Sequence, residues 1–250
     1  ASKQYEKAEA DYQYLMGKNP EALVFRLRLA QVYRAQGKLD QALKGFEALL
    51  DTDDDTAFAS LKGVTGIYVT RKAFDKAIGL LDGEMKKQPQ NLKIGLLKVA
   101  VLLAEKKYAS AEKTLDDLIE KHPKSIEPLI LLANLYMNRQ DARQDYGAAL
   151  KVFQRIISLD PKNIPARMRM AFIYKKLGDM DNAILSYEAV LKLDENYAPA
   201  ANDLAYLYAD RGQNLDEALM LAKKAQQLIP DNPDVEDTLG WVYLKRGSLL

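Results

Sequence analysis

Apolar and polar positions follow a helical rhythm along the chain, with apolar residues three and four positions apart in stretches of about fourteen residues. An alanine followed four residues later by an aromatic or aliphatic residue recurs through these stretches. The alanines are Ala8, Ala42, Ala77, Ala111, Ala149, Ala183 and Ala218. Their spacings of 34, 35, 34, 38, 34 and 35 residues predict a structural unit that repeats along the whole chain.

Two further series divide each unit into two helices. The packing residues four positions after the alanines are Tyr12, Phe46, Leu81, Leu115, Phe153, Tyr187 and Ala222, and the positions eight residues later hold Pro20, Asp54, Pro89, Pro123, Pro161, Glu195 and Pro230. Proline lacks a backbone N–H, so it stops one helix and starts the next element. Before each later alanine stands a second series, namely Tyr33, Tyr68, Leu102, Tyr136, Tyr174, Tyr208 and Tyr243, usually with a small residue three positions earlier. We therefore expect two helices per unit.

The small residues explain how such helices pack. Two helices of about fourteen residues, each about 21 Å long, approach closely only where small side chains face each other. A lone helix pair cannot bury both of its faces, so successive pairs must stack. The chain is therefore predicted to be all-α, a solenoid of helix pairs.

The pattern resembles the tetratricopeptide repeat family. The order of large residue, leucine, glycine or alanine, tyrosine, then alanine, aromatic residue, alanine and proline is visible in LRLAQVYRAQGKLDQALKGFEALLDTD, RMAFIYKKLGDMDNAILSYEAVLKLDE and NDLAYLYADRGQNLDEALMLAKKAQQLIP. The match runs from about residue 3 to residue 247. The resemblance implies a right-handed alpha-alpha superhelix whose first helices line a concave groove for a peptide or a protein surface.

The register predicts a single solenoid over residues 1–250. Residues 3–20 form the second helix of a truncated repeat and residues 233–250 the first helix of another, so both ends look cut from a longer array. The predicted complete repeats are 23–56, 57–91, 92–125, 126–163, 164–197 and 198–232.

Two local departures interrupt the register. Residues 137–148, MNRQDARQDYGA, add four residues between the two helices of one unit, which predicts a longer loop and no domain boundary. Lys106 stands where other units have the turn glycine, at Gly37, Gly178, Gly212 and Gly247.

Groove residues are expected on the first helices, on the side away from the alanine packing face. The central ones are apolar and comprise Leu96, Ala100, Leu103, Ile130, Met137, Met168 and Phe172; the others are Lys62, Lys93, Asn134, Arg169, Lys175, Asn202, Tyr206 and Trp241. The nearly all-apolar stretch LKIGLLKVAVLLAE favours an exposed patch that binds an apolar segment. The alternative is that this stretch only packs tightly against its neighbours.

One ligand type of the family is excluded by the residues. Tetratricopeptide domains that clamp a C-terminal carboxylate use lysine and asparagine on successive first helices. Asn134 matches one such place, but Ile130 stands where the lysine of the same helix belongs and Arg169 where the asparagine of the next helix belongs. Pro199 and Asp203 occupy the last pair, where lysine and arginine are expected.

The amino-acid composition argues against several classes of function. Lys and Arg number 36 against 35 Asp and Glu, so no strong net field favours nucleic acid or an anionic membrane. The absence of cysteine excludes disulfides and thiolate metal sites. The longest apolar run, residues 94–104, is too short to span a bilayer. The start shows no signal peptide, so the compartment stays open, with the bacterial periplasm or envelope favoured over the cytoplasm.

Catalytic chemistry has little support in the sequence. His122 is the sole histidine, before a proline at a helix end, where a structural role is expected. The run DTDDDT at 51–56 lacks the glycine and distal glutamate of a calcium loop, and no glycine-rich phosphate loop is present. We expect no enzyme activity, no cofactor and no metal site.

Two functions are therefore weighed. The favoured one is an interaction scaffold for a protein or peptide, and the cut ends would allow self-association. The alternative is a carbohydrate-handling accessory in which Tyr206, Trp241 and Asn202 contact a polysaccharide. The stretch from Leu204 to Gly247 resembles units common in bacterial multi-repeat proteins, including envelope lipoproteins linked to exopolysaccharide.

Overall fold

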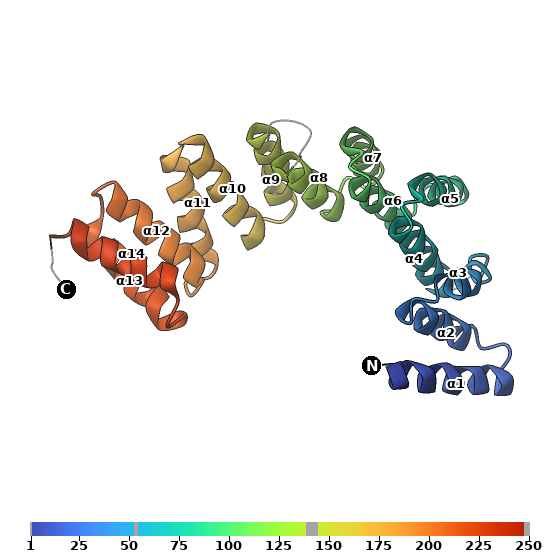
Figure 1. Ribbon diagram of the computed structural model, residues 1–250. Coiled ribbons are helices and arrows are strands. Elements are labelled where there is room, and N and C mark those ends of the chain that lie inside the picture. The colour runs from blue at the N-terminus through green and yellow to red at the C-terminus, as the bar shows by residue number, and fades with distance from the viewer. Residues whose placement is uncertain (1, 53–54, 139–144, 248–250) are drawn as a thin grey trace. The chain divides into compact units, whose positions relative to one another are not determined.

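A computed structural model describes residues 2–52, 55–138 and 145–247 (Figure 1), with side chains described from Gln4 onward. The described residues form helices and no strand, which confirms the predicted all-α class. The helices are α1 (Ser2–Lys18), α2 (Leu23–Ala35), α3 (Leu39–Glu47), α4 (Asp55–Thr70), α5 (Phe74–Lys87), α6 (Leu92–Ala104), α7 (Tyr108–Lys121), α8 (Glu127–Asn138), α9 (Tyr146–Leu159), α10 (Ile164–Leu177), α11 (Met180–Leu193), α12 (Ala198–Asp210), α13 (Leu215–Leu228) and α14 (Pro233–Lys245).

The helices fall into two compact units, residues 1–123 and residues 124–250, which we call unit 1 and unit 2. Within unit 1 each helix from α1 to α7 packs against the next along the chain, and within unit 2 the same holds from α8 to α14. First helices of neighbouring repeats also contact each other directly: α2 contacts α4, and α12 contacts α14. The predicted repeat boundaries and one continuous solenoid over residues 1–250 stay predictions.

The periodic alanines lie at the closest packing positions. Every alanine of the series after Ala8 is completely buried. These residues are Ala42, Ala77, Ala111, Ala149, Ala183 and Ala218. The residues four positions later are buried as well, namely Phe46, Leu81, Leu115, Phe153, Tyr187 and Ala222. Burying one large apolar side chain contributes about 1.5–3 kcal/mol, so this pair of series forms the core of every helix pair.

The turns after first helices that the structure describes share a backbone geometry. Residues with positive φ occur at Gly37, Lys72, Lys106, Gly178, Gly212 and Gly247. The next backbone N–H then donates to the carbonyl of the periodic tyrosine or leucine, as from Lys38 to Tyr33 at 2.9 Å. This bond closes the helix end as in a Schellman motif. The sequence pattern revealed the glycines and Lys106 but missed Lys72.

A hydrogen bond of the same kind closes the turn between α8 and α9, which contains the inserted residues. The Asp145 N–H donates to the Tyr136 carbonyl at 3.0 Å, although more residues separate the two than in the other turns. Met137 and Asn138 belong to α8, while Tyr146 begins α9. Helices α8 and α9 pack together in unit 2, so the insertion is no boundary between compact units. Its central residues 139–144 lie outside the described residues.

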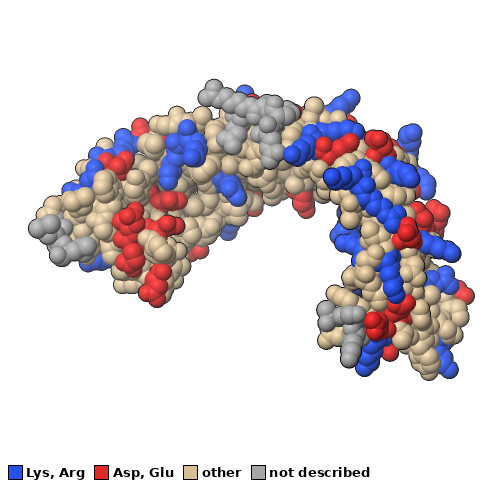
Figure 2. All heavy atoms as spheres, viewed as in Figure 1, with Lys and Arg blue, Asp and Glu red and all other residues tan. Residues whose placement is uncertain are grey.

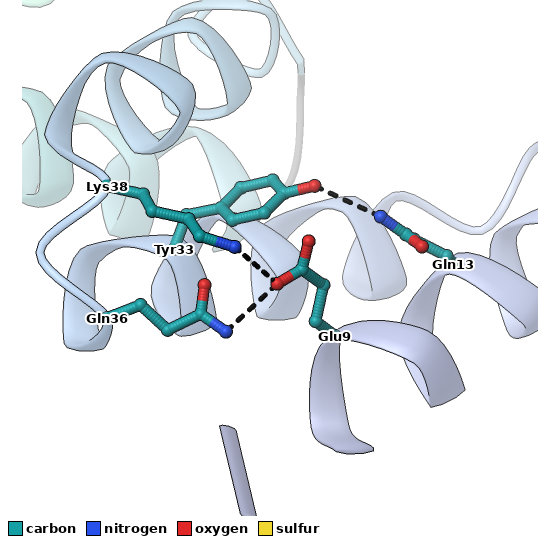
Figure 3. Close-up of polar contacts among 5 residues, drawn as sticks. All are labelled: Glu9, Gln13, Tyr33, Gln36 and Lys38. Carbon is teal, nitrogen blue, oxygen red and sulfur yellow. Dashed lines mark hydrogen bonds and ion pairs between the residues drawn. The ribbon is translucent and has the colours of Figure 1, made fainter. Parts of the chain in front are cut away.

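Three of the periodic tyrosines tie their first helix to the preceding second helix. The Tyr68 hydroxyl donates to Glu47 at 3.2 Å and the Tyr208 hydroxyl donates to Glu188 at 2.8 Å. In α1 and α2 the equivalent contact runs from Gln13 Nε2 to the Tyr33 hydroxyl at 3.2 Å (Figure 3).

Beside this contact, Glu9 accepts hydrogen bonds from Lys38 Nζ at 2.8 Å and Gln36 Nε2 at 2.9 Å (Figure 3). The bond from Lys38, followed by that from Gln36, lowers the pKa of the Glu9 carboxyl. The end helix α1 is therefore held to α2 by polar contacts as well as by packing.

Ion pairs recur near the same turns. A cation after the first helix pairs with an aspartate at the start of the preceding second helix, as in Arg71 with Asp40 at 2.7 Å and Arg246 with Asp216 at 2.6 Å. Arg211 pairs with Asp181 in the same way. Because the aspartates are largely exposed, each pair contributes only about 0.2–1 kcal/mol.

Lysine at the left-handed turn position carries backbone strain that glycine would avoid. A side chain in this conformation costs about 1–2 kcal/mol, partly offset by the greater freedom of glycine in the unfolded chain. Lys106→Gly should therefore raise the free energy of unfolding by about 1 kcal/mol in urea denaturation. Lys106→Ala keeps the Cβ atom and should give no such gain. Equal stabilisation by both variants would contradict the strain argument.

The tie between Tyr208 and Glu188 predicts a loss of stability at alkaline pH. Burial, and after it the Glu188 carboxylate, raises the pKa of Tyr208 to about 12. In the unfolded chain the hydroxyl ionises near pH 10, so folded stability should fall as the pH rises from about 10 to about 12. Urea denaturation over this range should show a smaller fall for Tyr208→Phe. Tyr14→Phe, which removes an exposed hydroxyl, is the control and should follow the unmodified chain.

Candidate binding groove

A hollow of about 450 Å³ lies between α10 and α12 in unit 2. Its lining residues are Pro165, Met168, Arg169, Phe172, Lys175, Tyr187, Tyr197 and Asp203. Four of them, all on α10, were predicted as groove residues from the sequence. We call this space the α10–α12 hollow.

Helix α10 presents its apolar residues to the hollow because of its register. Asn163 caps the helix, accepting from the Ala166 N–H at 3.0 Å, and Ala171 is completely buried against the core. Met168 and Phe172, one turn apart, line the hollow beside this buried face, and Met168 also packs against the core. Phe172 remains 38% exposed, a large apolar surface in contact with solvent.

The lining of the α10–α12 hollow includes Tyr187, which carries a polar hydroxyl group. Tyr187 of α11 is buried, and this burial raises the pKa of its hydroxyl, with the Asp203 carboxylate adding to the effect. Lys175 Nζ lies 3.5 Å from Asp203 and 6.0 Å from the centre of the Tyr187 ring. The hydroxyl therefore stays neutral at physiological pH, beside one cation and one anion.

Aromatic residues occupy the same position on the three first helices α10, α12 and α14. They are Phe172, Tyr206 and Trp241, spaced by 34 and 35 residues, and we call them the aromatic row. Tyr206 is 37% exposed, and Trp241 is half-buried against the core. The corresponding residues of unit 1 are Gln31, Gly66 and Ala100. Each aromatic residue was a groove candidate from the sequence, at the same position of its first helix.

Two buried polar atoms lie on the helices of this row. Asn202 Oδ1 on α12 and Trp241 Nε1 on α14 make no hydrogen bond to any group in the described part of the chain. Lys245 Nζ lies 4.7 Å from the centre of the Trp241 ring. A buried polar atom without a partner costs about 1–3 kcal/mol, and both atoms have almost no solvent-accessible surface.

The predicted groove residues of α8 are less well placed to contact a ligand. Ile130 is 40% exposed and Asn134 is half-buried, but Met137 is buried, with only 6% exposed. Met137 therefore offers almost no surface to a ligand, although the sequence pattern assigned it to the groove. The reason is that it lies in the last turn of α8, which packs against α9.

Unit 1 places its predicted residues on α4 and α6. Lys62 and Ala100 are exposed, whereas Leu96 and Leu103 are half-buried. Most of the remaining apolar residues of α6 are buried, so packing accounts for much of its apolar character. A patch that joins these residues with those of unit 2 stays a prediction.

A second hollow, of about 810 Å³, lies in unit 1 and includes the predicted Lys93. Three of its charged residues, Asp51, Glu84 and Lys87, pair with one another. Lys87 Nζ pairs with Glu84 at 2.8 Å and with Asp51 at 3.5 Å, while Lys93 Nζ lies 5.8 Å from the Phe58 ring. The α10–α12 hollow and the aromatic row are therefore the stronger candidate site.

No group of His, Asp and Glu side chains in the described ranges could hold a metal ion, and no described helix is long and apolar enough to cross a membrane. His122 follows the end of α7 and is half-buried.

The fold and the site together define a helical repeat array with a solvent-accessible face on its first helices. A family pattern described as tetratricopeptide repeat matches residues 1–64, 68–135 and 142–185, and a second with the same description matches residues 168–233. The chain belongs to the tetratricopeptide repeat family.

Similar proteins come from bacteria and eukaryotes. The TPR repeat-containing protein PA4667 of Pseudomonas aeruginosa is 26% identical over 149 residues, 60% of this chain and 25% of that protein. Tetratricopeptide repeat protein 37 of Xenopus laevis is 23% identical over 228 residues, 89% of this chain and 14% of that protein. The chain thus spans a quarter or less of the length of these relatives.

Solved structures share the fold. The C-terminal part of a TPR repeat-containing protein from Cytophaga hutchinsonii aligns with a TM-score of 0.68 and 16% identity, covering 94% of this chain and 95% of that one. MamA aligns with a TM-score of 0.52 and 22% identity, covering 66% of this chain and 94% of that one. At such identities the likeness concerns the fold alone.

Proposed function

We propose that the chain is a non-enzymatic scaffold that binds an extended segment of a partner protein on the face formed by α10, α12 and α14. The observation that carries this proposal is the aromatic row beside the α10–α12 hollow. Exposed aromatic residues at one repeated position provide apolar contact area at low entropic cost. A monomer gains nothing in stability by exposing them to water.

The polar groups of the face suit a peptide backbone. Trp241 Nε1 and Asn202 Oδ1 are buried in the unbound chain; once their side chains turn toward the ligand, the first would donate to a carbonyl and the second would accept from an N–H. An extended segment offers both groups at every residue, because its backbone is not engaged in secondary structure. The hollow beside Met168 and Phe172 is large enough to take an apolar side chain of the segment.

A carbohydrate ligand is the second candidate, since Tyr206, Trp241 and Asn202 could also stack on and hydrogen-bond a sugar. Lys245 already lies over the Trp241 ring, which leaves less of that ring free for stacking on a sugar. Titrations with oligosaccharides, followed by Trp241 fluorescence, distinguish the two candidates. A response to glycans alone would decide for carbohydrate.

Phe172→Asp tests the peptide site. Peptides selected from a displayed random library on the unmodified chain should bind the variant at least about tenfold more weakly, because a charge replaces a central apolar contact. The matched control is Leu185→Asp on α11, which changes a 59% exposed leucine away from the aromatic row. Calorimetry measures affinity and circular dichroism checks folding. Unchanged affinity of Phe172→Asp for every selected peptide counts against this face.

A further inference from the structure

Charge is distributed unevenly over the three helices of the proposed site. Helix α10, IPARMRMAFIYKKL, carries four cations and no acid. Helices α12 and α14, APAANDLAYLYAD and PDVEDTLGWVYLK, together carry five acids and one cation. The aromatic row therefore crosses from a basic helix to two acidic ones.

The cations of α10 surround Phe172. Arg169 and Lys175 line the hollow, and Lys176 Nζ lies 5.4 Å from the centre of the Phe172 ring. Arg167, in contrast, donates to the Pro161 carbonyl at 2.8 Å at the start of the helix. Three cations are therefore within reach of a ligand that contacts Phe172.

An acid shares a helix face with each of the other two aromatic residues, while Lys245 Nζ also lies 4.7 Å from the centre of the Trp241 ring. Asp210 lies one turn after Tyr206, and Asp237 lies one turn before Trp241, so each shares a helix face with its aromatic residue. Figure 2 shows Asp and Glu side chains gathered over the α12–α14 end of unit 2 and Lys and Arg side chains over α10.

Several of these charges are available to a ligand. Arg169, Asp210 and Asp237 are exposed and form no ion pair with a side chain in the described ranges 4–52, 55–138 and 145–247. Lys175 and Asp203, in contrast, form an ion pair with each other at 3.5 Å. At the turns, likewise, cations such as Arg246 are neutralised by an aspartate of the preceding second helix.

We infer that the segment bound by this face carries its charges in two blocks, with acidic residues over α10, basic residues over α12 and α14, and apolar residues facing the aromatic row. This inference rests on the proposed function and specifies the partner. Opposite charges across an interface set orientation and exclude wrong partners more than they add affinity. The charge gradient would thus fix the direction in which the segment lies.

The geometry sets the length of a test peptide. Neighbouring packed helices lie about 8–10 Å apart, and an extended chain advances about 3.3 Å per residue. A peptide of about twelve residues is therefore long enough to span the three helices with some excess at each end.

The test compares isomeric peptides of equal composition, with both termini capped. In two of them glutamates occupy one half and lysines the other, in either order along the chain, with leucines between the charges. In the third, glutamates and lysines alternate. One block order should bind the full chain at least about tenfold more tightly than the alternating isomer. This preference should shrink as salt rises to about 0.5 M, because exposed charges are screened.

Charge reversal on the protein locates the effect. Arg169→Glu with Lys176→Glu should abolish the preference for that block order. The matched control, Lys151→Glu with Arg155→Glu, reverses two exposed cations of α9 that do not line the hollow and should leave the preference unchanged. All three proteins are compared by calorimetry after circular dichroism confirms their helical content.

The outcomes separate the two proposals. Equal affinity for block and alternating peptides, with both weakened by Phe172→Asp, overturns the charge inference and leaves the proposed function standing. A block preference that survives reversal of Arg169 and Lys176 also overturns the inference. Absence of binding by every peptide overturns the proposed function together with the inference.

Discussion

Close approach of two helices over a fully buried alanine is the constraint on which this structure depends. At each pair the alanine methyl group fills the space, and the large residue one turn later packs beside it, as Ala183 and Tyr187 do in α11. Packing at this density leaves no room for a longer side chain. Because the same residue pair recurs every 34 or 35 residues in most units, each pair repeats the geometry of the last, and equivalent residues face equivalent surroundings.

Because equivalent residues of the repeats have equivalent surroundings, the fold was predictable from the sequence. The candidate site was less predictable. The periodic alanines, the prolines and the tyrosines identify two helices per unit, because each type has one structural role. The sequence did not reveal the positive φ of Lys72, because a lysine side chain does not by itself indicate a left-handed backbone turn. Met137 was assigned to the groove by its spacing, but the last turn of α8 is covered by its packing. Spacing fixes the face of a helix, whereas burial depends on what lies against that face.

The site arises from the positions that packing does not use. On α10, α12 and α14 the core takes Ala171, Ala205 and Val242, while the aromatic row projects from another side of the same helices. Unit 1 has small or polar residues at this row position, so its surface there offers less apolar area. The repeated scaffold thus leaves the chemistry of one face free to differ from repeat to repeat without disturbing the core.

Apolar contact and charge have separate roles on that face. The aromatic row supplies area, which is non-directional, so alone it would accept a segment in either direction and in several registers. The cations around Phe172 and the acids beside Tyr206 and Trp241 are placed at opposite ends of this area, and only one arrangement of ligand charges satisfies both ends. Specificity in a repeat protein can therefore come from a gradient across successive helices, where no single repeat carries enough information to select a partner.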